Sequence, residues 1–295
     1  MSARAADGDA GTAIMLPPFV PDRFTQLHHT TAWSTLEPAV RRRYNRLYGV
    51  RCNEQFMLFE SGFTARVVGR IAEHARRRGE RELVVRLEGL LADEIRHHRA
   101  FDAFNRARMP EVCAAGPVFT ALPPRERAAL DVAARTPALW PVLLWLVLAL
   151  EEFSIAFAAM VCAAPGIDPD YAALHAAHAR DERRHVHLDA EVLTWLLGRA
   201  GRAARRVQAA LFRRLLAEVV APRRSGVAVI RRLCREFPPL AAHEAVMVGE
   251  VRALGQDRGV RDLLDDPRRM PTCAALARSH PEFAWGAFRA DPSRR

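Results

Sequence analysis

Lysine is absent from this sequence of 295 residues, so all 44 of its lysine-plus-arginine positions are arginines. Because surfaces that bind nucleic acid usually combine both residue types, we attribute this replacement to the coding bias of a GC-rich genome. The net charge of +10 is therefore poor evidence for a nucleic-acid partner. We predict instead that the arginine runs at 41–43, 76–78 and 205–206 form solvated helix faces.

Cysteine pairs and long apolar runs are also missing. The five cysteines are odd in number, lie far apart and include no C-x-x-C motif, which argues against a disulfide framework and against a cysteine zinc site. The longest apolar stretch, Ala138–Leu150, contains 13 residues, whereas a membrane span needs roughly 20. We therefore predict a soluble protein of the reducing cytoplasm, with no membrane partner.

Strand-like alternation of apolar and polar residues is almost absent. Apolar residues instead recur at i, i+3, i+4 and i+7, which is the helical period. The predicted fold class is all-α. We place helices at 33–48, 52–78, 80–108, 125–134, 138–163, 168–198, 203–220 and 225–236, with shorter ones between 238 and 278.

The four longest predicted helices form two hairpins joined by a longer connection, which is the layout of a ferritin-like four-helix bundle with one crossover. We assign residues 23–198 to this bundle. Residues 199–295 are predicted to be additional C-terminal helices, a helical annex packed on the bundle within the same domain. Residues 1–22 are predicted to be a disordered N-terminal lead-in, because the chain starts without the apolar run of a signal peptide.

Two short motifs carry the strongest chemical signal. The segments D-E-I-R-H, at 93–97, and D-E-R-R-H, at 181–185, each contain Glu-x-x-His. That spacing puts a carboxylate and an imidazole on one face of a helix, where they can bind one metal ion or bridge two. The copies lie on the second and fourth long helices, which indicates a carboxylate-bridged two-iron site between them.

Such a site needs one more glutamate from each remaining helix. The first long helix offers Glu60, surrounded by phenylalanines, and Glu54. Glu60 lies 34 residues before Glu94, a more usual hairpin reach than the 40 residues from Glu54, so we favour Glu60.

The third long helix offers Glu151 and Glu152 within an otherwise apolar segment. An ionised acid at the centre of a buried helix costs several kcal/mol unless a metal or another partner compensates it. We favour Glu151 because large apolar residues, Phe153 and Ile155, follow at i+2 and i+4. Glu152 then pairs with an arginine.

The fourth long helix adds a third imidazole. His178 precedes Glu182 by four residues and His185 by seven, so these three side chains share one helix face. The candidate metal ligands are therefore four carboxylates and three imidazoles: Glu60, Glu94, His97, Glu151, His178, Glu182 and His185.

The order Glu, Glu-x-x-His, Glu, His-x-x-x-Glu-x-x-His, over about residues 54 to 187, resembles the non-haem di-iron arylamine N-oxygenases, the p-aminobenzoate N-oxygenase family. The resemblance implies the same seven ligands, two iron ions as cofactor, and O2-dependent oxygenation of an aryl amine to a hydroxylamine, nitroso or nitro product in specialised metabolism. The ligand chemistry also suits manganese. Related di-iron proteins further imply that Asp93 orients His185 and that Asp181 orients His97.

Other functions remain open at this point. A di-iron enzyme that hydroxylates C–H bonds uses a similar ligand set, and so does a ferritin-like iron-storage or peroxide-scavenging protein, although the latter is usually shorter and does not need His178.

No G-x-G-x-x-G fingerprint for a nicotinamide or flavin cofactor is present, so the electrons for O2 activation must come from an external donor or reductase. A homodimer is compatible with the sequence, which does not fix the oligomeric state. His98 and His187 are predicted to face solvent, and His74, His175, His243 and His280 have no assigned role.

Overall fold

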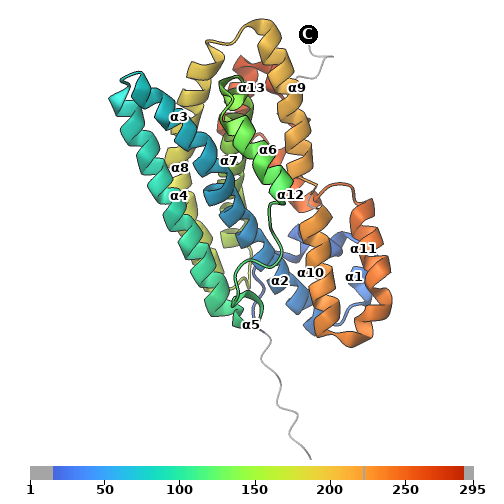
Figure 1. Ribbon diagram of the computed structural model, residues 1–295. Helices are drawn as coiled ribbons and strands as arrows, with labels where there is room; N and C mark the ends of the chain where they lie inside the picture. Colours follow the sequence, from blue (N-terminus) through green and yellow to red (C-terminus); the bar gives the residue numbers. More distant parts are fainter. Residues whose placement is uncertain (1–15, 222, 289–295) are drawn as a thin grey trace, which may run out of the picture.

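The protein is all-α in a computed structural model that describes residues 16–221 and 223–288, and no strand occurs in those two ranges. Four long helical columns form a ferritin-like bundle, shown in Figure 1. Its helices are α2 (Pro38–Met57), η3 (Leu58–Thr64) and α3 (Ala65–Arg77) in one continuous column, then α4 (Arg81–Arg108), α7 (Trp140–Ala163) and α8 (Pro169–Leu197).

The shorter elements surround these columns. Before the bundle lie η1 (Asp22–Phe24), η2 (Leu27–His29) and α1 (Ala32–Thr35). The crossover between α4 and α7 holds α5 (Pro110–Cys113), α6 (Pro124–Ala134) and η4 (Pro137–Leu139). After the bundle come α9 (Arg202–Val219), α10 (Arg223–Glu236), η5 (Pro238–His243), α11 (Glu244–Ala253), α12 (Arg258–Leu264), α13 (Pro271–Ser279), η6 (Pro281–Phe283) and η7 (Gly286–Phe288).

The first column corrects the predicted helix break between residues 48 and 52. Gly49 continues the helix instead of ending it, and a Cβ there would lie 2.5 Å from the Cβ of Phe19. The glycine is needed for this close approach of the N-terminal segment, not for a turn. Further along, the column widens into the π-helix η3, a form that is rare and frequent at functional sites.

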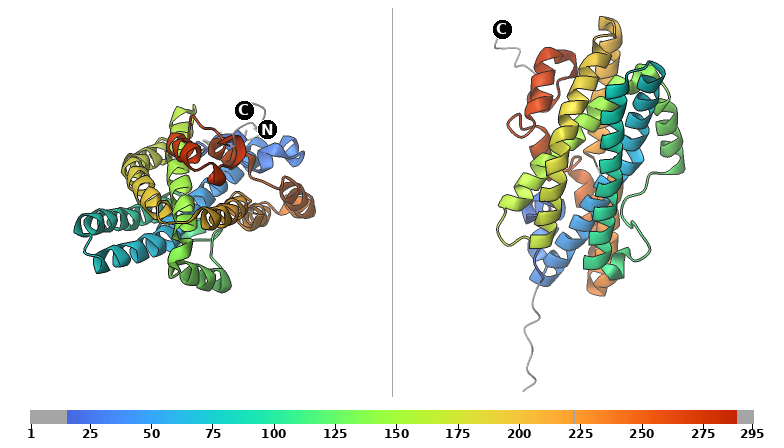
Figure 2. Two further views of the ribbon diagram at one scale, coloured as in Figure 1. Left: turned by 90° about the horizontal axis from the view of Figure 1, so that it is seen from above. Right: turned by 90° about the vertical axis from the view of Figure 1, so that its left-hand side faces the viewer.

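The two hairpins have short, well-defined turns. Gly79 adopts a φ of +76° between α3 and α4, a left-handed conformation that glycine enters without a steric penalty. Asp168 is the N-cap of α8, where its carboxylate accepts hydrogen bonds from the backbone N–H groups of Asp170 and Tyr171. These turns make α3 antiparallel to α4, and α7 antiparallel to α8, as Figure 2 shows.

Helix α7 is the apolar centre of the molecule. The span Pro137–Ala163 is long and apolar enough to cross a membrane, but 83% of its most apolar window is buried inside the protein. A helix that is hydrophobic on all sides in this way is a core helix. It is packed against α8 and α3 on the bundle side and against α9, α12 and α13 on the other.

The N-terminal segment that the structure describes is packed, which corrects part of the predicted lead-in. Phe19 and Val20 are fully buried, and both of their backbone N–H groups donate to the side chain of Asn45. Residues 16–22 therefore belong to the folded protein. Residues 1–15 of the predicted lead-in lie outside the described residues.

The C-terminal annex contacts the bundle through an aromatic cluster and a buried charge. Trp145 of α7 packs against Phe212, Phe283 and Trp285 at centroid distances of 5.4–6.1 Å. At another place, Arg51 of α2 is fully buried beside Asp257, which precedes α12. Figure 1 shows α10 alongside α2, with α11 on the other side of α10.

Candidate metal centre

The seven residues predicted from the motifs come together between the four columns. They form two groups, and within each group the ligand atoms lie within 4.8 Å of one another. Glu182 belongs to both groups, and all seven side chains are buried. The first group is Glu60, His97, His178 and Glu182; the second is Glu94, Glu151, Glu182 and His185.

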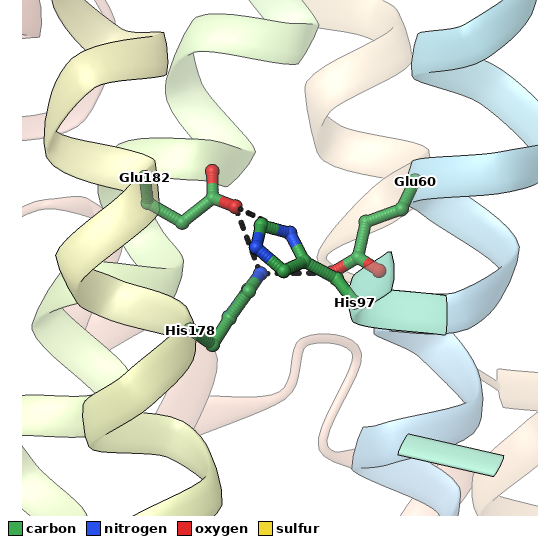
Figure 3. A group of neighbouring side chains, drawn as sticks. All are labelled: Glu60, His97, His178 and Glu182. Carbon is green, nitrogen blue, oxygen red and sulfur yellow. Dashed lines mark ion pairs between the residues drawn. The ribbon is translucent and has the colours of Figure 1, made fainter. Parts of the chain in front are cut away.

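Helix periodicity explains why these side chains meet. On α8, His178, Glu182 and His185 follow at i, i+4 and i+7 and line one face. Glu94 and His97 share a face of α4 in the same way. Glu60 extends from the π-helix η3, and Figure 3 shows its carboxylate directed toward the imidazoles across the bundle.

The facing atoms are close but do not form hydrogen bonds with one another. His178 Nε2 lies 2.9 Å from Glu60 Oε1 and 2.9 Å from Glu182 Oε1. His185 Nδ1 lies 3.1 Å from Glu94 Oε1. None of these oxygens and nitrogens has a hydrogen-bond partner. These atoms therefore face a shared space between the helices.

This donor set fits metal cations. Burying an unpaired carboxylate is costly, and polar groups in protein interiors are normally hydrogen-bonded. Both carboxylate oxygens lack hydrogen-bond partners in all four glutamates of the two groups, Glu60, Glu94, Glu151 and Glu182. Carboxylate and imidazole ligands on helices of a bundle suit iron or manganese, because structural zinc prefers closed sets of cysteine and histidine.

The protonation of the site reflects its excess of buried carboxylate. Burial lowers the pKa of His178, but the facing Glu60 and Glu182 outweigh burial and raise the pKa to about 10. Burial also lowers the pKa of His185, and Glu182 and Glu94 raise it to about 11. The carboxylates thus stabilise positive charge between them, which is the electrostatic requirement for holding a cation.

One carboxyl group near the site was not anticipated from the sequence. Asp189 lies four residues after His185 on α8, is fully buried and faces the carboxyl group of Glu151. Burial raises the pKa of Asp189 to about 7. Burial is also the larger cause that raises the pKa of Glu151 well above its usual value, and the nearby Asp189 carboxyl adds to it. The i+4 spacing from His185 is the one sequence signal that points to it.

The two competing glutamates have structural contacts instead. Glu54 accepts hydrogen bonds from the backbone N–H groups of three consecutive crossover residues, 118–120. Glu152 accepts hydrogen bonds from the backbone N–H groups of Thr272 and Cys273, at the start of α13. The arginine partner expected for Glu152 is thus replaced by a helix N-terminus, which favours a negative charge.

The aspartates of the two motifs contact the histidines of the opposite helix, and both predicted pairings are confirmed. His97 Nε2 lies 3.1 Å from Asp181 Oδ2, and His185 Nε2 lies 3.2 Å from Asp93 Oδ2. A neutral ring that donates from Nε2 leaves Nδ1 as the acceptor facing the glutamates. The aspartates therefore orient both rings so that Nδ1 faces the glutamates.

The prediction that His98 and His187 face solvent is correct for His187 and only partly correct for His98. His98 is half-buried, and its Nδ1 lies 2.9 Å from Ser61 Oγ of η3, whereas His187 is exposed.

Two phenylalanine rings form an aromatic layer beside the site. Phe56 and Phe101 lie against His178 at centroid distances of 5.6 and 5.1 Å. These rings keep one side of the site dry.

His175 has a structural role that the sequence did not reveal. It is fully buried, and its Nε2 lies 3.0 Å from Asn53 Oδ1. Asn53 in turn donates to Asn105 Oδ1, at 2.8 Å. The three polar side chains connect α8, α2 and α4 beside the aromatic layer.

Comparison with known proteins agrees with this geometry. A search of curated proteins finds no match. The profile of one family, described as P-aminobenzoate N-oxygenase AurF, matches residues 16–266. The matched range includes all seven residues and most of the annex. Because the match spans most of the chain, the protein belongs to the p-aminobenzoate N-oxygenase family, whose members are di-iron oxidoreductases.

Proposed function

We propose that the seven clustered residues hold two iron ions and that the protein catalyses O2-dependent N-oxygenation of an aryl amine, to a hydroxylamine, nitroso or nitro product of specialised metabolism. The observation that carries the proposal is the pair of buried donor groups sharing Glu182, whose facing carboxylate oxygens and ring nitrogens converge within 4.8 Å in each group. Family membership supports the amine as substrate class.

In this proposal the protein residues prepare the site. Two ferrous ions, when bound, supply electrons for the activation of O2. Glu182 belongs to both donor groups, so it would help to hold both ions. Asp93 and Asp181 hold the rings of His185 and His97, while Phe56 and Phe101 exclude water near His178. The three imidazoles are unevenly distributed, two in the first group and one in the second, so the two groups would give their ions different ligands.

Further parts of the proposal concern partners and location. An external reductase or other electron donor supplies the electrons, because the sequence has no nicotinamide or flavin fingerprint. The enzyme works in the cytoplasm, consistent with its five free cysteines, without nucleic-acid or membrane partners. We propose that the enzyme assembles as a homodimer. Manganese is the alternative to iron that the same carboxylate and imidazole ligands would hold.

The proposal is tested by metal analysis and isotope labelling. Protein loaded anaerobically with ferrous iron is expected to hold about two ions per chain. It is then reduced and mixed with ¹⁸O2 and a panel of aryl amines, and mass spectrometry detects label on nitrogen. One zinc ion per chain, or no bound metal, would refute the di-iron site. Labelled C–H hydroxylation without N-oxygenation would make the enzyme a hydroxylase, whereas accumulation of an iron mineral would indicate storage.

His178→Ala separates the oxygenase from a storage protein. The variant retains three donors in the first group, so we expect it to bind iron. Loss of the third imidazole changes one ion's environment, and amine oxygenation should fall roughly tenfold or more. Iron content and labelled product are measured together, with His187→Ala as the exposed control on the same helix. Equal product yield from His178→Ala and the parent would remove His178 from the site.

Asp93→Asn and Asp181→Asn test the orientation of the imidazoles. An asparagine keeps the size of the side chain but weakens the hydrogen bond that fixes the ring and its tautomer. We expect helicity to be unchanged and iron retention or turnover to fall roughly 10- to 100-fold, the scale for such partners of metal ligands. Circular dichroism and iron release to a chelator measure the two quantities. Release at the parental rate in both variants would make the aspartates ordinary surface acids.

A further inference from the structure

Both metal-binding motifs contain an arginine at the same place, because D-E-I-R-H and D-E-R-R-H share the pattern D-E-x-R-H. Arg96 and Arg184 occupy this position, directly before His97 and His185. The function proposed above uses the glutamates, histidines and aspartates of the motifs but gives these arginines no role. Their contacts in the structure assign them one.

Each arginine contacts both aspartates. Arg96 lies 2.5 Å from Asp93 of its own helix and 2.6 Å from Asp181 of α8. Arg184 lies 2.8 Å from Asp181 of its own helix and 3.3 Å from Asp93 of α4. The four side chains therefore form a closed ring across α4 and α8, with near two-fold symmetry.

The ring lies between solvent and the buried histidines. Its arginines are 56% and 64% exposed, and its aspartates 19% and 22%. The histidines beneath the aspartates are only 5% and 4% exposed. The carboxylate of each aspartate thus contacts one histidine on its inner side and two guanidinium groups on its outer side.

The charge of the ring decides what it can do. Two guanidinium groups and two carboxylates balance, so the ring does not present the surplus positive charge that an anionic ligand or acidic partner requires. A single exposed ion pair contributes little to stability, about 0–1 kcal/mol, but a network of several charges can hold its side chains in place. The ring therefore suits a role in orientation.

We propose that Arg96 and Arg184 are positioning residues that fix both aspartates, and through them both imidazoles, so that the metal ions are retained. This inference rests on the proposed metal-binding function. Either arginine bridges α4 to α8 alone, so one can partly replace the other. Loss of both frees the aspartates to rotate toward solvent and leaves the imidazoles without a fixed partner.

The test compares Arg96→Met, Arg184→Met and the double variant, with Arg183→Met as the matched control. Arg183 is the neighbour of Arg184, is exposed and has no ion pair among those of the described residues. Methionine keeps much of the aliphatic stem of arginine and good helix propensity. Circular dichroism and thermal unfolding verify that each variant is folded before metal is added.

The main readout is the rate at which anaerobically loaded Fe²⁺ is lost to an excess of chelator. We expect release roughly 10-fold faster or more in the double variant, a smaller change in each single variant, and the parental rate in Arg183→Met. Co²⁺ loading gives a second readout, since altered imidazole orientation shifts the visible ligand-field bands even when two ions still bind.

The outcomes separate this inference from the function on which it rests. Parental protein that binds no iron or cobalt refutes the metal centre itself. Parental protein with two bound ions, and a double variant with unchanged release and unchanged Co²⁺ bands, refutes the role of the arginines alone. Release that is accelerated equally in Arg183→Met and the double variant also refutes it, because the effect then reflects surface charge.

Discussion

Glu182→Ala is expected to reduce bound iron from about two ions per chain to nearly none, because both donor groups lose the same carboxylate. Glu182 has an unusual environment that supports this large effect. Burial raises its pKa, but the surrounding His178, His185 and His97 outweigh burial and hold the pKa well below its usual value. The side chain is therefore an anion at neutral pH, ready to bind cations. Iron analysis after anaerobic loading and desalting measures the loss.

Glu54→Ala is the control for this prediction. Glu54 is equally buried, and burial raises its pKa, but its oxygens accept backbone hydrogen bonds of 2.7, 2.6 and 2.9 Å from the crossover. Its loss should lower stability by roughly 1–3 kcal/mol and leave the iron content near two ions per chain. If Glu182→Ala retained two ions while folded, or if Glu54→Ala lost them, the assignment of the two residues would be wrong.

Local spacing explains why so much of this site was predictable. Ligands on one helix are fixed relative to one another by the helical period, so the sequence alone placed Glu94 and His97 on one helix face, and His178, Glu182 and His185 on another. The structure divides each of these faces between the two donor groups. The choice of Glu60 came from its distance along the chain to Glu94. Each prediction required only that two helices form a hairpin.

The remaining features depend on contacts between distant segments. Nothing in the spacing indicates that the helix widens into η3 at Glu60, because a π-helix arises from packing and not from residue propensity. Asp189 resembles any acid within a helix in the sequence, but in the structure it is fully buried and faces Glu151 of α7. The predicted break near residue 50 failed for a related reason: Gly49 faces Phe19, which lies 30 residues earlier in the chain.

The buried contact between the bundle and the annex, Arg51 with Asp257, was equally invisible to local patterns, and it carries the second large prediction. Asp257→Ala is expected to lower the free energy of unfolding by about 3–5 kcal/mol, the cost of leaving a buried charge without its partner. Arg51 is fully buried, and its Nη1 lies 3.7 Å from Asp257 Oδ2. That oxygen also accepts hydrogen bonds from Tyr48 and Gln26, at 2.6 and 3.1 Å. Urea unfolding followed by circular dichroism measures the difference.

The double variant Arg51→Met, Asp257→Ala distinguishes a lost charge partner from a lost helix cap. Asp257 also accepts a hydrogen bond from Val260 N–H at the start of α12, which is worth about 1 kcal/mol. If the unpaired guanidinium is the main cost, the double variant should be more stable than Asp257→Ala by roughly 1–3 kcal/mol. If it is less stable than the single variant, Arg51 is compensated by other groups, such as the Tyr48 ring 4.7 Å away and Ser225 Oγ at 2.9 Å. Because the pair contacts none of the seven clustered residues, the folded fraction of each variant should bind iron like the parent.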